Sequence, residues 1–132
     1  MNPHHLYKDQ NRFSWTRIDM LLVVYEQTID AIQRGADAIA AGRTNELISI
    51  RLRTMKCLVT IIDGLNQNAG DTPQQILRLC LFVLDQVETD ELESWQSALK
   101  IMQTLYDGFQ GIQDEAREAE HRGEIPALDA SA

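Results

Sequence analysis

The residue pair with the most suggestive spacing for chemistry is Glu118 and His121, a Glu-x-x-His pattern that helical di-iron proteins use to bind metal. Such a site needs a second copy of the pattern on another helix. The only other histidines are His4 and His5, close to the N-terminus. We therefore expect no metal site, and also no phosphotransfer site, which would need a histidine exposed in the middle of a helix.

The remaining reactive side chains do not form a catalytic pattern either. Cys57 and Cys80 lie in helical patterns without a nearby histidine, so neither is an activated nucleophile, and such cysteines usually behave as small buried apolar residues. No glycine-rich loop for phosphate follows a strand. Several carboxylates lie near predicted helix ends, where caps and solvated charges are common: Asp63, Asp85, Asp90 and Glu91. We expect no enzyme activity, no cofactor and no disulfide.

The length and the net charge of the chain exclude further classes of protein. A chain of 132 residues can bury a single core without disulfides or metals. A net charge of -8 disfavours tight binding to nucleic acid, and the one dense basic group (Arg51, Arg53 and Lys56) is typical of a solvated helix face. The sequence has no basic-then-apolar leader and no membrane-spanning apolar run, so we expect a cytoplasmic protein that does not associate with membranes.

Helical periodicity runs through most of the sequence, and we expect no sheet. The first helix should begin at Thr16, because Thr16 and Asp19 resemble a capping box, and it should stop at Gly42. Its apolar residues follow a 4-3 spacing typical of helix bundles: Ile18, Leu22, Tyr25, Ile29, Ile32, Ala36 and Ile39.

The second helix should begin at Thr44 or Asn45 and run to about Leu65. It carries two apolar seams, so we expect both to be covered by neighbouring helices. One seam comprises Ile48, Leu52, Met55, Val59 and Ile62, and the other comprises Leu47, Ile50, Leu58, Ile61 and Leu65.

The third helix should be capped at Thr72, should have Pro73 as its first residue and should end near Val87. Residues 76–84 would form a helix that is apolar on nearly every side. Its outer side must therefore be covered by another segment of this chain, by a second copy, or by a different protein.

The fourth helix should open at residues 89–91 and fade near Gly123, with a seam of Leu92, Trp95, Leu99, Met102, Tyr106 and Phe109. Short loops make consecutive helices antiparallel, so residues 16–123 predict an all-α, up-down-up-down four-helix bundle. With about 14 residues, the third helix would be about 21 Å long against more than about 35 Å for the others. We expect this difference to leave an apolar groove at one end.

The flanking segments are assigned separately. Residues 1–15 are rich in large apolar groups, and Leu6, Tyr7 and Phe13 could form a removable cover for the groove. Alternatively, Phe13 and Trp15 pack against the start of the first helix. Residues 124–132 contain a helix-breaking proline and predict a flexible tail.

Residues 14–112 resemble the FliS family of flagellar secretion chaperones. The family's first helix opens with a Thr-Ala-Ser-Pro-x-Glu type start before an apolar run that reaches a tyrosine; here residues 14–24 lead into Tyr25, with Arg17 in place of the proline. Residues 61–65 resemble the end of the family's second helix, residues 76–84 its short apolar helix, and residues 105–109 its Leu-x-x-Ala-Trp segment.

The resemblance implies an export chaperone that binds the disordered C-terminal segment of flagellin in the cytoplasm and prevents premature polymerisation before secretion. The apolar residues in excess of the core would then bind the partner: Leu21, Val24, Tyr25, Leu79, Phe82 and Val83. Two alternatives stay open. The chain could be a chaperone or adaptor for another flagellar or secreted protein, or a self-associating structural bundle, and a weak homodimer is compatible with each.

Overall fold

The protein is all-α. The computed structural model describes residues 16–66 and 68–125, and within these ranges every regular element is a helix. The elements are α2 (Arg17–Ala40), the 3-10 turn η1 (Thr44–Glu46), α3 (Leu47–Asp63), α4 (Asp71–Val87), α5 (Leu92–Gly111) and α6 (Gln113–His121). Across the same ranges, no helix combines the length and the apolar character needed to cross a bilayer.

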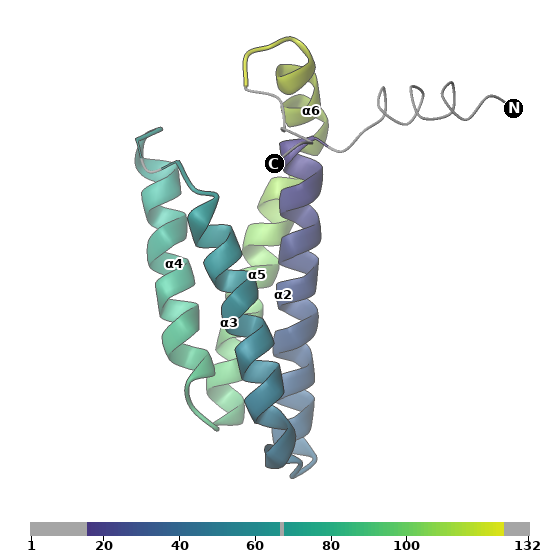
Figure 1. The fold of residues 1–132 in the computed structure, drawn as a ribbon, viewed down its shortest axis with the longest axis vertical. Coiled ribbons are helices and arrows are strands. Elements are labelled where there is room, and N and C mark those ends of the chain that lie inside the picture. The colour runs from purple at the N-terminus through teal and green to yellow at the C-terminus, as the bar shows by residue number, and fades with distance from the viewer. Residues whose placement is uncertain (1–15, 67, 126–132) are drawn as a thin grey trace, which may run out of the picture.

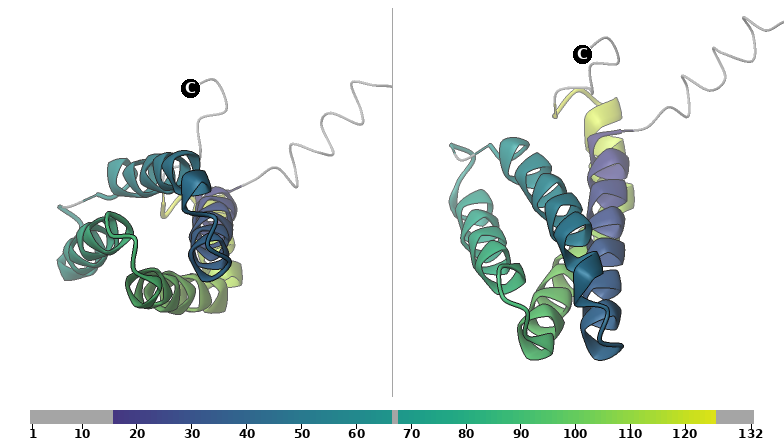
Figure 2. Two further views of the ribbon diagram at one scale, coloured as in Figure 1. Left: turned by 90° about the horizontal axis from the view of Figure 1, so that it is seen from below. Right: turned by 60° about the horizontal axis from the view of Figure 1, so that its bottom comes forward.

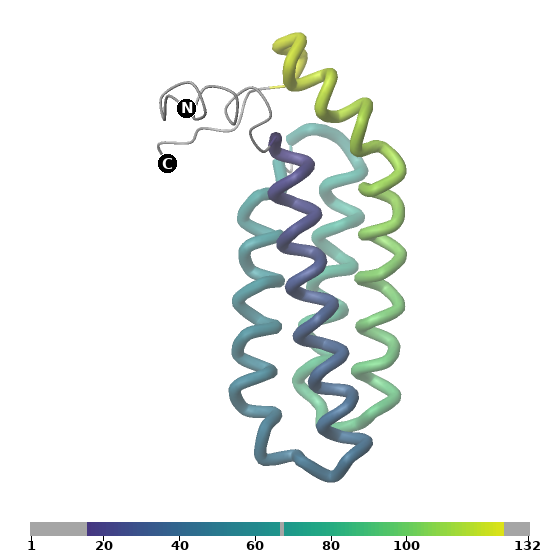
Figure 3. Tube along the Cα trace, turned by 90° about the vertical axis from the view of Figure 1, so that its right-hand side faces the viewer, coloured from purple at the N-terminus to yellow at the C-terminus, as the bar shows by residue number. Residues whose placement is uncertain are grey.

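The four long helices surround one core. Consecutive helices contact one another, and α5 also contacts α2, so that the four form a closed ring when viewed end-on (Figures 1 and 2). Figure 3 shows α2 and α5 side by side, with α6 continuing beyond α5 to contact α2. Each helix of the ring supplies at least one fully buried side chain, such as Tyr25, Leu58, Val83, Trp95 and Met102.

The start of α2 is confirmed at the predicted capping residue. The Thr16 backbone N–H and hydroxyl donate to Asp19 Oδ2 at 3.1 and 3.0 Å. From α6, Gln113 Nε2 and Arg117 Nε donate to Asp19 Oδ1 at 2.9 and 2.8 Å. One carboxylate therefore caps α2 and also fastens α6 against it. The helix ends at Ala40, and Gly42 has φ of 74°, the conformation of a glycine after a helix C-terminus.

The Asp19 carboxyl is expected to make stability depend on pH in the acid range. Partial burial by itself raises its pKa, but the hydrogen bonds from Arg117, Gln113 and Thr16 outweigh this and lower the pKa to about 2. A carboxyl whose pKa is lower in the folded state stabilises the fold above its unfolded pKa of about 4. We expect about 2 kcal/mol of stability to be lost between about pH 4 and pH 2. In urea titrations across this range, Asp19→Asn should reduce the dependence of the free energy of unfolding on pH. An unchanged dependence would contradict the assignment of this effect to Asp19.

Three helix boundaries differ from the prediction. Residues 44–46 form a 3-10 turn, so α3 begins at Leu47, and it ends at Asp63. The third helix begins at Asp71 rather than at Pro73, so Thr72 is inside the helix. As a result α3 and α4 have 17 residues each, and the expectation of a third helix shorter than the second was wrong. Turn residues at both ends of α3 shorten it, because they offer the backbone alternatives to the α-helix.

The predicted fourth helix is two helices. α5 ends at Gly111, Ile112 leaves the helical conformation with φ of -110° and ψ of 10°, and α6 then begins at Gln113. The break lets α6 lean toward the start of α2, where Gln113 and Arg117 bind Asp19.

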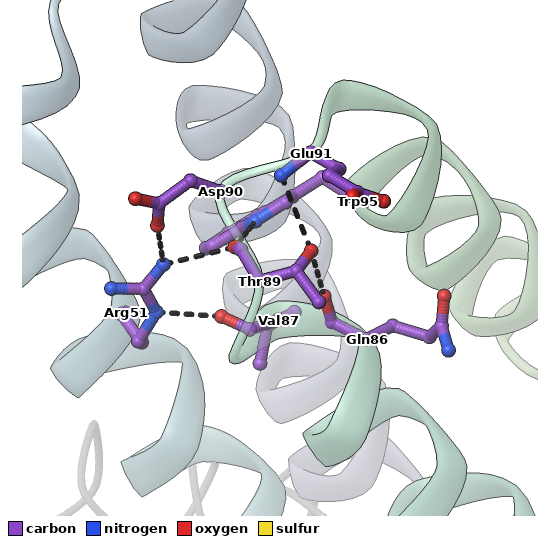
Figure 4. Close-up of polar contacts among 7 residues, drawn as sticks. All are labelled: Arg51, Gln86, Val87, Thr89, Asp90, Glu91 and Trp95. Carbon is purple, nitrogen blue, oxygen red and sulfur yellow. Dashed lines mark hydrogen bonds and ion pairs between the residues drawn. The ribbon is translucent and has the colours of Figure 1, made fainter.

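A cluster of contacts centred on Trp95 holds the helices together at the end of the ring where α4 connects to α5. The Trp95 ring is buried against Gly35 of α2, where an added Cβ would lie 2.2 Å from Trp95 Cζ3. Trp95 Nε1 donates to the Thr89 carbonyl at 2.8 Å. As Figure 4 shows, Arg51 of α3 donates to the carbonyls of Val87 and Thr89 at 2.6 and 2.9 Å and also pairs with Asp90. The cluster joins all four helices of the ring.

The two seams of α3 are not both covered, contrary to the prediction. Leu47, Leu58 and Ile61 are buried in the core. On the other seam, Ile48, Leu52 and Val59 are 77%, 54% and 47% exposed. The reason is the arrangement of the ring, in which α3 packs between α2 and α4. The outer residues of that seam therefore face away from the core, while Met55 and Ile62 of the same seam are partly buried.

Candidate partner-binding groove

An apolar hollow lies between the first half of α4 and the last half of α5. It has a volume of about 260 Å³, and none of the side chains around it is charged. Five large apolar residues line it: Ile76, Leu79, Leu105, Phe109 and Ile112. Thr72, Gln75, Thr104 and Gly108 complete the lining. We call this hollow the α4–α5 groove.

Gly108 leaves part of the groove open. An added Cβ at this position would meet no atom within 4 Å, and the backbone is helical without positive φ. The absent side chain therefore creates space that a larger residue would occupy.

Two of the predicted partner-binding residues are available on α4. Leu79 and Phe82 are 37% and 44% exposed, and Leu79 also lines the α4–α5 groove. Val83, in contrast, is fully buried in the core. The predicted all-apolar helix is confirmed in this sense: its inner side forms core, while Leu79, Leu81 and Phe82 face outward.

The predicted residues of α2 do not line the groove. Leu21 and Val24 are partly buried against the core. Tyr25 has no exposed surface, so it contacts no partner directly in this conformation and is a core residue. Its ring packs behind the groove against Phe109, with the two ring centroids 5.4 Å apart. Leu6, Tyr7 and Phe13, predicted to cover the groove, lie outside the described residues.

The sequence analysis placed Phe109 and Tyr106 on one apolar seam, but it did not predict that the other residues of α5 that line the groove form a binding surface. Leu105, Gly108 and Ile112 follow a 3-4 spacing, which places them on one face of a helix. That signal was present, but the spacing alone does not tell which of two adjacent apolar faces is covered.

The Tyr25 hydroxyl is a buried polar atom without a hydrogen-bond partner in the described structure. Burial raises its pKa well above the usual value, and the neighbouring Cys80 adds to this. Burial likewise raises the pKa of the Cys80 thiol to about 11, which keeps this residue protonated and unreactive at neutral pH. Cys80 therefore behaves as a buried apolar residue, as predicted.

Removing the Tyr25 hydroxyl is expected to preserve or increase stability. An unpaired buried hydroxyl costs about 1–3 kcal/mol relative to a paired one, so Tyr25→Phe should raise the free energy of unfolding by up to about 1 kcal/mol. Tyr106→Phe is the matched control, because the Tyr106 hydroxyl donates to Glu26 Oε1 at 2.6 Å and should give a small loss. Urea denaturation of both variants measures the difference, and a clear loss in Tyr25→Phe would mean that the hydroxyl has a partner.

A polar hollow of about 390 Å³ lies on the opposite side of α5, bounded by α2 and α6. Its charged groups form interactions within the protein, since Asp19 pairs with Arg117 and Glu26 accepts a hydrogen bond from Tyr106. Within the described part of the chain, no three His, Cys, Asp or Glu side chains are grouped to hold a metal. Glu118 lies 3.8 Å from Arg122 in an ion pair, and His121 is exposed at the end of α6.

Comparison of the chain with protein-family models, with curated proteins and with solved structures finds no match.

Proposed function

We propose that this protein is an export chaperone of the FliS type, which holds the C-terminal segment of flagellin in the cytoplasm and keeps it from polymerising before secretion. In this proposal the ring of α2 to α5 is an up-down-up-down four-helix bundle. The protein acts by sequestration and makes or breaks no covalent bond.

The observation that supports this function best is the uncharged α4–α5 groove in a protein of net charge -8. Apolar grooves between helices bind the apolar face of a partner helix, with anchor side chains spaced three or four residues apart. Leu79 continues the apolar lining onto the outer surface of α4, and Phe82 follows one turn later. A client segment can therefore make contacts along more than one helical turn.

The direct test is calorimetric titration of the full chain with the C-terminal flagellin segment of the same organism, followed by circular dichroism of the mixture. We expect a dissociation constant of about 1 μM or lower. Helix content should increase and the heat-capacity change should be negative, because a disordered client folds as it buries apolar surface. The absence of binding at high concentration would contradict the flagellin proposal.

Filling the groove should weaken this binding without unfolding the protein. Gly108→Leu places a side chain in the open space of the groove, where the added Cβ has no atom within 4 Å. We expect affinity for the flagellin segment to fall at least about tenfold, equivalent to about 1.4 kcal/mol of binding free energy. Calorimetry measures the affinity, and thermal unfolding verifies that the variant is folded.

The matched control for the groove is Gly111→Leu. Gly111 lies in the same helix, is exposed and also has open space around an added Cβ, but it does not line the groove. Its affinity should stay within about twofold of the unmodified protein. Equal affinities for the two variants would place the client elsewhere. Binding of a different exported segment, blocked by Gly108→Leu, would indicate a chaperone of the same type with another client.

A further inference from the structure

A second apolar surface lies on the outer side of the α3 and α4 pair. On α3 it contains Ile48, Leu52 and Val59, and on α4 it contains Leu81, which is 49% exposed. We call these four residues the outer α3–α4 face. The α4–α5 groove contains none of them.

The directions of the side chains place the four residues on the same outer side of the α3 and α4 pair. Arg51 reaches α4 and the loop after it, so its direction marks the α4 side of α3. At about 100° per residue, Ile48, Leu52 and Val59 are rotated about the α3 axis by about 60–100° from Arg51, all three in the same direction. Ile50 lies about 100° in the opposite sense and borders a hollow with α2.

The same reasoning applies to α4. Leu79 marks the side that faces α5, because it lines the α4–α5 groove. Leu81 is rotated from Leu79 by about 200°, so it lies on the α3 side of α4. Val59 and Leu81 thus border the same seam from outside. Leu52 and Ile48 continue the exposed side of α3 toward the level at which α4 ends.

The hydrogen bonds of Arg51 also set the register of the two helices. They place residue 51 of α3 near residues 87 and 89. Because α3 and α4 run in opposite directions (Figure 1), Val59 lies level with Leu81 to within about one helical turn. By the same count Lys56 lies near the level of Asp85, and Asp63 lies near the level of Arg78.

These four charged residues form an alternating pattern around Val59 and Leu81 of the outer α3–α4 face. Lys56 and Asp63 of α3, and Arg78 and Asp85 of α4, are all exposed. None of them takes part in an ion pair within the described ranges. Each helix therefore presents one positive and one negative group beside its exposed apolar side chains.

This pattern is complementary to itself. A two-fold axis parallel to the helices places α3 of one copy over α4 of the other at the same height. Lys56 then faces Asp85 of the second copy, and Asp63 faces Arg78, while Val59 packs on Leu81. Both pairs occur twice, because the interface is symmetric.

We propose that the outer α3–α4 face binds a second copy of this chain and forms a symmetric dimer. The two helices of 17 residues present a face about 25 Å long and about 20 Å wide. This size is near the lower end of stable protein interfaces, so we expect a dissociation constant in the micromolar range. The proposal does not depend on the function of the groove.

Sedimentation velocity of the full chain over a range of concentrations tests the dimer. The unmodified protein should change from monomer to dimer around micromolar concentration. Val59→Glu should remain monomeric with unchanged circular dichroism, because it buries a charge at the centre of the interface. Gly108→Leu should dimerise like the unmodified protein, which separates this face from the groove.

Charge reversal identifies the orientation. Lys56→Glu and Asp85→Lys should each weaken the dimer at least about tenfold, because each places two pairs of like charges across the interface. An equimolar mixture of the two variants should recover dimerisation, since every facing pair is again of opposite charge. If a variant were monomeric because its own fold was damaged, mixing it with the second variant would not restore the dimer. A monomer at all concentrations, or a dimer that Val59→Glu leaves unchanged, would overturn the proposal.

Discussion

Gly35→Ala is expected to reduce the free energy of unfolding by about 2 kcal/mol or more, although alanine is ordinarily the better helix former. The added Cβ would lie 2.2 Å from Cζ3 and 2.4 Å from Cε3 of Trp95. The ring cannot move aside easily, because it is fully buried and its Nε1 is bound to the Thr89 carbonyl. The overpacked core should therefore cost more than the gain in helix propensity.

The control for this substitution is Gly108→Ala, in another helix of the ring. There the added methyl group meets no atom within 4 Å, so only the helix propensity changes and stability should rise by about 0.5–1 kcal/mol. Urea denaturation of both variants should give changes of opposite sign. Stabilisation by Gly35→Ala would show that Trp95 does not pack against this position.

Arg51→Lys is expected to cost about 1–3 kcal/mol of stability although the positive charge is retained. The guanidinium donates to two carbonyls, pairs with Asp90, and lies 5.9 Å from the centre of the Trp95 ring. One of these carbonyls belongs to Val87, the last residue of α4, which has no partner in the next turn of its helix. A lysine ammonium cannot reproduce the planar arrangement of donors.

Arg53→Lys is the matched control for Arg51→Lys. Arg53 is two residues away on the same helix, is exposed, and has no side-chain hydrogen bond or ion pair with any described residue. Its replacement should change stability by less than about 0.5 kcal/mol. If both variants unfold at the same urea concentration, the contacts of Arg51 with the turn between α4 and α5 do not stabilise the fold.

The stability of the Trp95-centred cluster bears on the proposed function. This cluster joins all four helices at one end of the ring, whereas the α4–α5 groove lies toward the opposite end of α4. Arg51 contacts the C-terminal end of α4 and does not line the groove. We therefore expect Arg51→Lys to affect stability more than client binding.

The sequence alone determined the helical class and the approximate position of every long helix. Local interactions explain this success. Thr16 and Asp19 start α2 through hydrogen bonds between residues three apart, and Gly42 follows its end with a positive φ. Such signals depend on neighbours along the chain and can be read without knowing the fold.

Apolar periodicity identified the inner side of α2, where Ile18, Leu22 and Tyr25 are buried as predicted. It failed in part on α3, where Ile48, Leu52 and Val59 belong to a seam with the spacing of a core seam but face outward. The pattern shows that a side chain is apolar and not which neighbour covers it. Coverage depends on how many helices surround α3, which is a property of the assembled ring.

The groove and the Trp95-centred cluster were decided by the tertiary structure. Gly35 and Gly108 are both glycines inside apolar helices, yet one receives a buried tryptophan ring and the other opens onto a groove. Nothing within their own helices distinguishes them. The sequence determined which segments are helical and which of their faces are apolar, because local hydrogen bonds and periodicity suffice for both. Only the packing of α2, α4 and α5 decided where those faces meet and where they leave space, because that depends on contacts between residues far apart in the chain.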